Sequence, residues 1–273
     1  MADEVTLPTS LTERLADQFV GDARRLRQIA GDVTAFGDQL PDGAAARLNA
    51  VHDQLAQLEA ELHAARKQYL VRQIDGRPVA GLKLHLGCGA QRFPGWVNID
   101  ARGGDIRMDL RWPLPFADKT VHCVFACHVA EHLYREDELP ALLHEVRRVL
   151  TPSGVLRLVV PDIEQCLRAY VAGDDRFFAD RALTWSWSRN CRTRLDHFLG
   201  YAGAQQLLEN LDGHLYGYDF DTLALVLREA GFTQVERSTF MGSRHPELRV
   251  DHESRNATAN TNGKHYSLFV EAS

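Results

Sequence analysis

The fold of this chain is decided by one short stretch of its sequence, Leu84-His85-Leu86-Gly87-Cys88-Gly89. A second apolar run follows it, Trp96-Val97-Asn98-Ile99-Asp100, and ends in a carboxylate. An apolar strand that breaks into two glycines leaves bare backbone for the polar end of a ligand, and a carboxylate at the end of the next strand can accept hydrogen bonds from a ribose. These two runs predict a binding site for an adenosine cofactor.

The spacing of the glycines argues against a dinucleotide. A pyrophosphate site needs a third glycine three residues after the second, and an acidic residue about 20 residues further on. Here Arg92 stands at the third position, and Asp100 follows Gly89 much too closely to be that acidic residue. The sequence therefore favours an adenosine cofactor without a pyrophosphate.

Several further motifs follow in a fixed order, at residues 86–89, 95–100, 109–110, 113–118, 128–133, 145–154 and 227–232. With these motifs the chain, from about Lys83 to its C-terminus, resembles class I S-adenosylmethionine (SAM) dependent methyltransferases. It departs from them at Ala130, where relatives usually carry Leu, and at Ser153, where they often carry Gly. The resemblance implies that SAM is the cofactor. The residues that it assigns to SAM are Gly87, Cys88 and Gly89 at the methionine moiety, Asp100 at the ribose, Asp109 and Leu110 at the adenine, and His128 at the edge of the methyl-transfer cavity.

Apolar periodicity predicts an α/β fold. Strands are expected at 82–86, 96–100, 105–109, 121–126, 155–160, 233–240 and 265–271, with helices at 136–150 and 219–231. This alternation is typical of a mostly parallel sheet with covered faces, and the resemblance implies a Rossmann-like class I methyltransferase sheet whose last strand is antiparallel. The methyltransferase domain is expected to span residues 80–273, with a lid over the acceptor at about 163–212.

The segment 1–75 follows a different pattern. Apolar residues three and four apart, at 26–40 and again at 48–69, predict two helices that a Gly- and Pro-containing turn folds into a hairpin. The hairpin either packs on its own catalytic domain or joins two chains as a homodimer, and the sequence leaves both possibilities open. Residues 75–78 are the expected linker.

Charge and composition exclude several classes of partner. With 31 Lys and Arg against 37 Asp and Glu, the net charge of −6 argues against a general nucleic-acid binder. The five cysteines form no CxxC pair, which favours a reducing compartment. No apolar run is long enough to cross a membrane, and the start of the chain lacks the order of a signal peptide. We expect a cytoplasmic protein with no membrane partner.

The predicted catalytic residues follow the fourth strand. Helical spacing would bring His128 and His132 to one face with Glu131 beside them, either as a general base or as ligands of Mg²⁺ or Zn²⁺. The motif is similar to the Glu-x-x-Glu-His of ubiquinone-pathway O-methyltransferases, in which these residues hold a metal. In this chain His128 stands where that motif has its first Glu, and an imidazole ligand favours Zn²⁺ over Mg²⁺. Alternatively, Glu131 and His132 cap the next helix. A further candidate is His214, since relatives often place a His there to face the acceptor.

The predicted lid is rich in aromatic and basic residues. Trp185 and Trp187 could stack on a sugar ring, with Arg189 and Asp162 binding its hydroxyls, although Trp residues of this kind often form a core and Asp162 could simply cap a helix. The chain also resembles methyltransferases of bacterial polysaccharide and glycoside assembly, such as the actinobacterial sugar O-methyltransferases of methylmannose polysaccharide synthesis. That resemblance implies an oligosaccharide or other small-molecule acceptor. An aromatic or natural-product acceptor and a non-catalytic SAM-binding scaffold are the alternatives.

Overall fold

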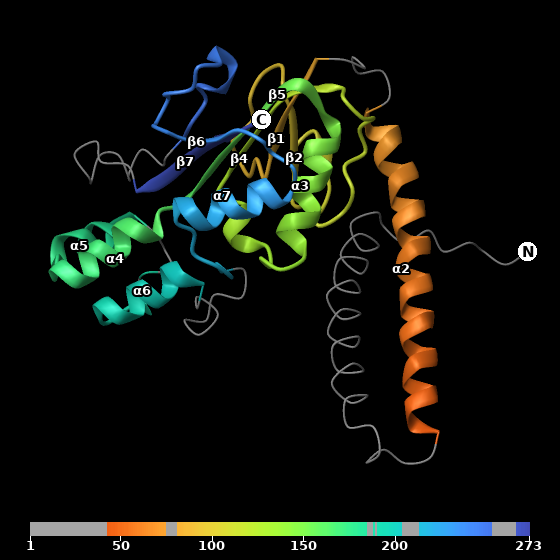
Figure 1. Ribbon diagram of the computed structural model, residues 1–273, viewed down its shortest axis with the longest axis horizontal. Helices are drawn as coiled ribbons and strands as arrows, with labels where there is room; N and C mark the ends of the chain where they lie inside the picture. Colours follow the sequence, from red (N-terminus) through yellow and green to blue (C-terminus); the bar gives the residue numbers. More distant parts are fainter. Residues whose placement is uncertain (1–42, 75–80, 185–187, 189, 204–212, 253–265) are drawn as a thin grey trace, which may run out of the picture. The chain divides into compact units, whose positions relative to one another are not determined.

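The computed structural model describes residues 43–74, 81–184, 188, 190–203, 213–252 and 266–273 (Figure 1). The chain divides into two compact units, Met1–Gln73 and Ile74–Ser273. Each unit is described by itself below.

The second unit is built on a seven-stranded sheet with the order β3-β2-β1-β4-β5-β7-β6. All neighbouring pairs are parallel except those of β7, which runs antiparallel to both β5 and β6. This arrangement confirms the predicted Rossmann-like methyltransferase fold with its reversed last strand. The strands are β1 Leu82–Leu86, β2 Val97–Asp100, β3 Ile106–Arg107, β4 Val121–Cys127, β5 Leu150–Pro161, β6 Val235–Ser238 and β7 Ser267–Ala272. The helices are α3 Glu138–Val149, α4 Ile163–Ala172, α5 Asp175–Thr184, α6 Arg194–Ala202 and α7 Phe220–Glu229, with short 3₁₀ turns η2 Ala130–His132 and η5 Pro246–Leu248.

Strand β5 begins earlier than the predicted strand 155–160. Leu150 pairs with Val121, and Val155 pairs with Cys123, so β5 advances further than β4 between these two pairs. Residues 151–154 therefore form a bulge between two paired segments. The Thr-Pro-Ser-Gly sequence of this bulge suggests a turn, which is why periodicity alone places the start of the strand too late.

Helix α3 shows why the helices lie where the sequence predicts them. Leu139, Leu142 and Val146 lie on its buried face, and the carboxylate of Asp137 accepts a hydrogen bond from the backbone N–H of Glu138 at its start. Apolar residues three and four apart form one buried stripe, and a side-chain acceptor satisfies an N–H at the first turn. Figure 1 shows α3 beside α7; α3 also packs against β5, and α7 packs against β6 and β7.

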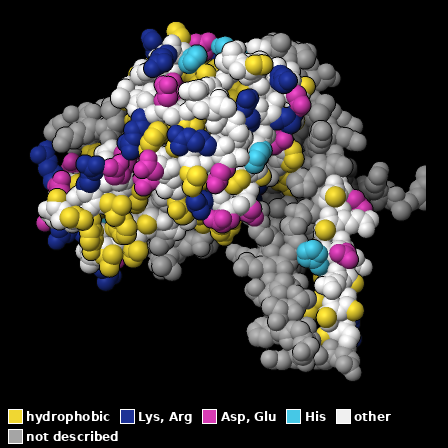
Figure 2. All heavy atoms as spheres, in the orientation of Figure 1, with side chains coloured by type: hydrophobic (Ala, Val, Ile, Leu, Met, Phe, Trp, Pro, Cys, Tyr) yellow, Lys and Arg dark blue, Asp and Glu magenta, His cyan; other side chains and the backbone are white. Residues whose placement is uncertain are grey.

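Helices α4, α5 and α6 form the described part of the predicted lid. They enclose a small core that includes Cys166, Phe178 and Tyr201. Figure 2 shows hydrophobic side chains gathered on the outer surface of this region, and those with large exposed fractions are Leu167, Tyr170, Val171, Leu195 and Leu199. This group of helices thus has an apolar outer surface as well as a core.

The first unit contains helix α2, Ala44–Ile74, where the second helix of the hairpin is predicted. Two residues of its expected apolar seam, Val51 and Leu58, are 48% and 41% exposed. The predicted helix at 26–40 lies outside the described residues, and a role for the hairpin in dimerisation stays a prediction. Within the described ranges, no helix is long and apolar enough to cross a membrane.

The sheet carries a buried histidine that is expected to make stability depend on pH. His85 is fully buried in β1, and its ring stacks on Phe93 with 4.2 Å between the centroids. Burial lowers the pKa of His85 to about 4, whereas the unfolded chain has the ordinary value of 6.5. Between these values the unfolded state binds the additional proton, so the free energy of unfolding falls as the pH falls. From pH 7 to pH 5, His85 is expected to contribute a loss of about 2 kcal/mol.

Urea unfolding at both pH values measures this loss, and a His85→Phe variant isolates it. Phenylalanine keeps the stack on Phe93 without a titratable group, so the variant should lose about 2 kcal/mol less than the parent chain. Equal losses in the two proteins would show that His85 does not contribute.

Candidate cofactor and acceptor site

The glycine turn after β1 is fixed by contacts that leave no room for a side chain. Gly87 has a φ of +64°, and a Cβ at this position would lie 2.3 Å from Cγ2 of Val129. The backbone N–H of Cys88 donates to the carbonyl of Ile99 at 3.0 Å. The N–H of Gly89 donates to Oδ2 of Asp100 at 2.9 Å. The two predicted runs of sequence therefore meet at the carboxyl ends of adjacent strands.

The carboxylate of Asp100, which is predicted to bind the ribose, is oriented by backbone donors. Its second carboxylate oxygen, Oδ1, accepts from the N–H of Arg102 at 2.8 Å. Each oxygen of a carboxylate can accept two hydrogen bonds, so these backbone donors orient the group and leave acceptor capacity on both oxygens. Two adjacent ribose hydroxyls match that capacity.

Replacing Asp100 by alanine is expected to raise the dissociation constant of SAM at least tenfold. A tenfold change corresponds to about 1.4 kcal/mol of binding free energy, which is close to the contribution of a hydrogen bond to a charged acceptor. Isothermal titration with SAM measures the change. An Asp118→Ala variant is a matched control, because this exposed carboxylate pairs with Arg148 outside the cavity. An unchanged dissociation constant in Asp100→Ala would place the ribose elsewhere.

A cavity of about 920 Å³ is lined by three of the seven predicted cofactor residues, whereas Gly87, Cys88, Leu110 and His128 do not line it. Gly89, Asp100 and Asp109 line it together with His132, which follows β4. Cavities of this size hold cofactors and drug-sized ligands. Its further lining residues are Ala90, Arg92, Ala101, Arg102, Gly103, Arg111, Leu133, Tyr134, Glu138, Gly213 and Leu215. This cavity, called the cofactor cavity below because it is predicted to hold SAM, thus reaches one of the residues predicted for acceptor chemistry, His132.

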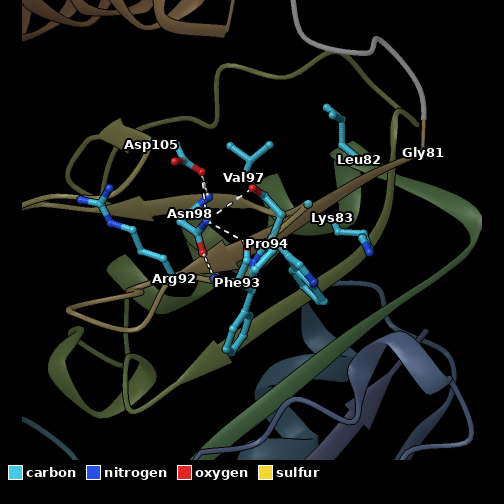
Figure 3. A pocket seen from close by; sticks show the side chains of 11 residues that line it. Gly81, Leu82, Lys83, Arg92, Phe93, Pro94, Val97, Asn98 and Asp105 are labelled. Atoms are coloured by element: carbon cyan, nitrogen blue, oxygen red, sulfur yellow. Dashed lines mark hydrogen bonds between the residues drawn. The ribbon is translucent and has the colours of Figure 1, made fainter.

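A second cavity, of about 660 Å³, is lined by none of the predicted site residues. It lies where β1 and β2 begin, and Figure 3 shows Asn98 at its centre. Nδ2 of Asn98 donates to Oδ2 of Asp105 at 2.9 Å and to the carbonyl of Phe93 at 3.2 Å. These bonds fix the loop that leads from the glycine turn to β2.

Beyond the end of β4, the structure brings three predicted residues together. One ligand atom from each of Glu131, His132 and His214 lies within 4.8 Å of the others. The backbone carbonyl of Glu131 accepts from the N–H of Leu215 at 2.7 Å, which holds the His214 segment against η2. The rings of His132 and His214 meet edge to face, with 5.0 Å between their centroids. His132 is exposed to the cavity, and the other two side chains are buried.

His128 lies beside this cluster and contacts its carboxylate. Its backbone has a φ of +56°, which is unusual for a residue with a side chain. Nδ1 lies 3.3 Å from Oε1 of Glu131, and Nε2 lies 3.1 Å from Oγ of Ser267. His214 therefore occupies the place in the three-residue group that the sequence assigned to His128.

Burial sets the protonation of the cluster. It raises the pKa of Glu131 to about 8, and neither of its oxygens has a hydrogen-bond partner among the described residues. Burial and the neighbouring His132 lower the pKa of His128 to about 4 and that of His214 to about 3. At neutral pH both imidazoles are neutral and can accept a proton or bind a metal.

The remaining predicted residues have simpler surroundings. Asp162 caps α4, since its Oδ1 accepts from the backbone N–H groups of Glu164 and Gln165. Helix α3 is capped by Asp137, so Glu131 and His132 do not cap it. Leu110 is buried beside Asp109. Trp185, Trp187 and Arg189 lie outside the described residues.

Two residues at the cofactor cavity were not predicted. Arg111 binds Asp109, which is its near neighbour in the sequence, and it also contacts Glu138. The pairing of Arg111 with Asp109 could have been suggested by their spacing. The contact with Glu138 depends on the fold, because a loop and the whole of β4 separate the two side chains in the sequence.

One part of the chain matches a known protein family. A family model described as a methyltransferase domain matches residues 91–158. No curated protein matches the sequence. Among solved structures, the chain is similar to a SAM-dependent methyltransferase from Thermotoga maritima described as a possible histamine N-methyltransferase. The identity is 14% over 76% of this chain and 88% of that one, with a TM-score of 0.39.

It is also similar to a SAM-dependent methyltransferase from Mesorhizobium loti, at 17% identity over 74% of this chain and 94% of that chain, with a TM-score of 0.40. A third similar structure, a SAM-dependent methyltransferase from Archaeoglobus fulgidus, has 16% identity over 77% and 93% of the two chains and a TM-score of 0.39. The match to a methyltransferase-domain model over residues 91–158 agrees with the predicted SAM-dependent methyltransferase, and the sheet described above, mostly parallel with its last strand antiparallel, is the one predicted for the class I fold.

Proposed function

We propose that this enzyme transfers the methyl group of SAM to a hydroxyl of a small carbohydrate. The observation that carries the proposal is the cluster of Glu131, His132 and His214, which reaches the cofactor cavity through His132. An aliphatic hydroxyl is far less acidic than a phenol and depends more on a group that removes its proton. General base catalysis contributes roughly 10²- to 10⁴-fold to a rate. A cluster able to activate an oxygen therefore favours a sugar hydroxyl over an aromatic one.

The cluster also fits a divalent metal. The carboxylate of Glu131 is buried and makes no hydrogen bond among the described residues, although Nδ1 of His128 lies 3.3 Å from its Oε1. The ligand atoms of two further imidazoles, those of His132 and His214, lie within 4.8 Å of this carboxylate and of each other. A buried acceptor of this kind is costly unless an ion or a donor satisfies it. Glu131, His132 and His214 would hold the ion, and a set with two imidazoles favours Zn²⁺ over Mg²⁺. When bound, the metal lowers the pKa of a coordinated hydroxyl.

The protein side chains have separate roles in the proposed reaction. Asp100 orients the ribose, which places the sulfonium near the glycine turn after β1. His132 lines the cavity and orients the acceptor hydroxyl behind the methyl group, since an in-line transfer depends on alignment. As the new carbon–oxygen bond forms, the bonding electrons of the methyl–sulfur bond pass to sulfur, and the hydroxyl proton passes to a neutral imidazole of the cluster. The products are the methyl ether and S-adenosylhomocysteine.

The acceptor class is tested by measuring S-adenosylhomocysteine formation from SAM with two panels of compounds. One panel holds mannosides and other short glycosides, and the other holds phenols and catechols. We expect turnover with glycosides at a rate at least tenfold above that with phenols. Turnover of phenols alone would assign an aromatic acceptor, and an absence of turnover with either panel would contradict the proposal.

A further inference from the structure

Arg111 stands between two acidic side chains in the wall of the cofactor cavity. Nε of Arg111 lies 3.0 Å from both carboxylate oxygens of Asp109, and its Nη2 also donates to Oδ2. On its other side, Nη1 lies 3.8 Å from Oε1 of Glu138. The side chains of Asp109 and Glu138 are only 11% and 3% exposed, so the guanidinium compensates two buried acids. Removing the cation would leave both without this charge partner.

Glu138 connects this arginine to the acceptor side of the cavity. Its other oxygen, Oε2, accepts a hydrogen bond from the backbone N–H of Tyr134 at 2.8 Å. Residues 132–134 line the same cavity as Asp109 and Arg111. A continuous series of contacts therefore runs from Asp109 through Arg111 and Glu138 to the segment that begins with His132.

We propose that Arg111 is a positioning residue that links the adenine end of the cofactor site to the segment 132–138. When the adenine is bound beside Asp109, Arg111 is held in place, and Glu138 then orders the segment that presents His132 to the acceptor. The inference rests on the placement of adenine at Asp109, not on the nature of the acceptor. It makes cofactor binding a condition for an ordered acceptor site.

Hydrogen exchange of the full-length protein tests the link, since the Tyr134 amide itself makes the connecting hydrogen bond. The probe is 5′-methylthioadenosine, which carries the adenine and ribose but no amino acid group. In the parent chain, saturating probe should slow exchange of residues 132–138 at least fivefold. In Arg111→Met, exchange should be fast with or without probe, and the dissociation constant of the probe should rise at least tenfold. Arg111→Lys keeps the charge without the planar fork and should recover part of both effects.

Two further variants separate this role from a general loss of structure. Arg228→Met replaces an exposed arginine of α7 and should leave exchange and binding unchanged. Glu138→Gln keeps an acceptor for the Tyr134 amide while removing the charge that faces Arg111. In Glu138→Gln the probe should no longer slow exchange of residues 132–138, and the dissociation constant of the probe should rise less than threefold. If Arg111→Met does not fold, Glu138→Gln provides the test.

The inference is overturned if the probe binds but leaves exchange of residues 132–138 unchanged in the parent chain. It is also overturned if folded Arg111→Met, or Glu138→Gln where Arg111→Met does not fold, still shows slowed exchange on binding. Failure of the parent chain to bind SAM would instead overturn the cofactor assignment, so the two failures can be distinguished.

Discussion

Glu131→Gln is expected to lower kcat at least 100-fold while changing the dissociation constant of SAM less than threefold. Burial raises the pKa of Glu131 to about 8, so its carboxyl is largely protonated near neutral pH until a metal or a protonated imidazole stabilises the carboxylate. Glutamine has nearly the same shape but cannot form that carboxylate. The side chain is 1% exposed and contacts His128 and His214, at 3.3 Å and 3.9 Å, so its ionisation acts directly on the proposed acceptor cluster. It does not line the cofactor cavity. The lost rate corresponds to the roughly 10²- to 10⁴-fold that an activating group supplies.

The measurement is release of S-adenosylhomocysteine at saturating acceptor, with SAM binding determined separately by calorimetry. This separates loss of the chemical step from loss of cofactor binding. Glu247→Gln is a matched control, since this glutamate pairs with His122 and lines neither cavity. A kcat within twofold of the parent value in Glu131→Gln would show that the acceptor is activated elsewhere.

Dialysis of the parent enzyme against a chelator distinguishes the two roles open to the cluster. If the residues hold a metal, activity should fall and return with Zn²⁺ or Mg²⁺, and Glu131→Gln should bind the ion at least tenfold more weakly in a direct titration. Full activity after dialysis would remove the metal and leave the imidazoles as the base.

The cofactor half of the site could be predicted from sequence because each residue ends a strand. Gly89 and Asp100 follow adjacent segments of the chain, and the parallel pairing of β1 with β2 brings the strand ends together. The acceptor cluster could not be fully predicted, because His214 joins it from beyond β5 and the lid helices, far from His132 in the sequence. The position of His214 depends on a hydrogen bond from the backbone N–H of Leu215 to the carbonyl of Glu131. The periodicity of apolar residues does not predict a single backbone hydrogen bond between distant loops.

A side chain with no role in the predicted site carries the largest expected effect on stability. Arg157 in β5 is fully buried. Its Nε donates to Oδ1 of Asp251 at 2.7 Å, and its Nη1 donates to Oε1 of Glu271 at 2.8 Å and to Oγ of Ser238 at 2.9 Å. The carbonyl of Thr239 accepts a further bond from Nη2 at 2.7 Å. One guanidinium thus joins β5, β6 and β7 to the segment that follows β6.

We expect Arg157→Met to lower the free energy of unfolding by about 3–5 kcal/mol, the range found when one partner of a buried ion pair is removed. The side chain of Asp251 is 1% exposed and would remain buried with its charge uncompensated. Urea unfolding at pH 7, followed by circular dichroism, measures the loss. Arg249→Met is the control, because this arginine contacts the carbonyl of Ser243 in the same segment without an ion pair to Asp251.

The variant Arg157→Met/Asp251→Asn shows whether the uncompensated charge causes the loss. Asparagine can still accept the hydrogen bond from the Met241 N–H, which Asp251 accepts at 2.6 Å, but it carries no charge. The free energy of unfolding of the double variant should therefore be higher than that of Arg157→Met by about 1 kcal/mol or more, because the effects of substitutions at contacting residues are not additive. No recovery would assign the loss to packing around Phe269, which lies 5.5 Å from the guanidinium. The connections from β1 to β2 and from β2 to β3 contain no helix. Leu248, from the segment after β6, packs instead against Phe125 and Phe269 on one face of the sheet. Arg157 holds that segment in place through Asp251 and the carbonyl of Thr239.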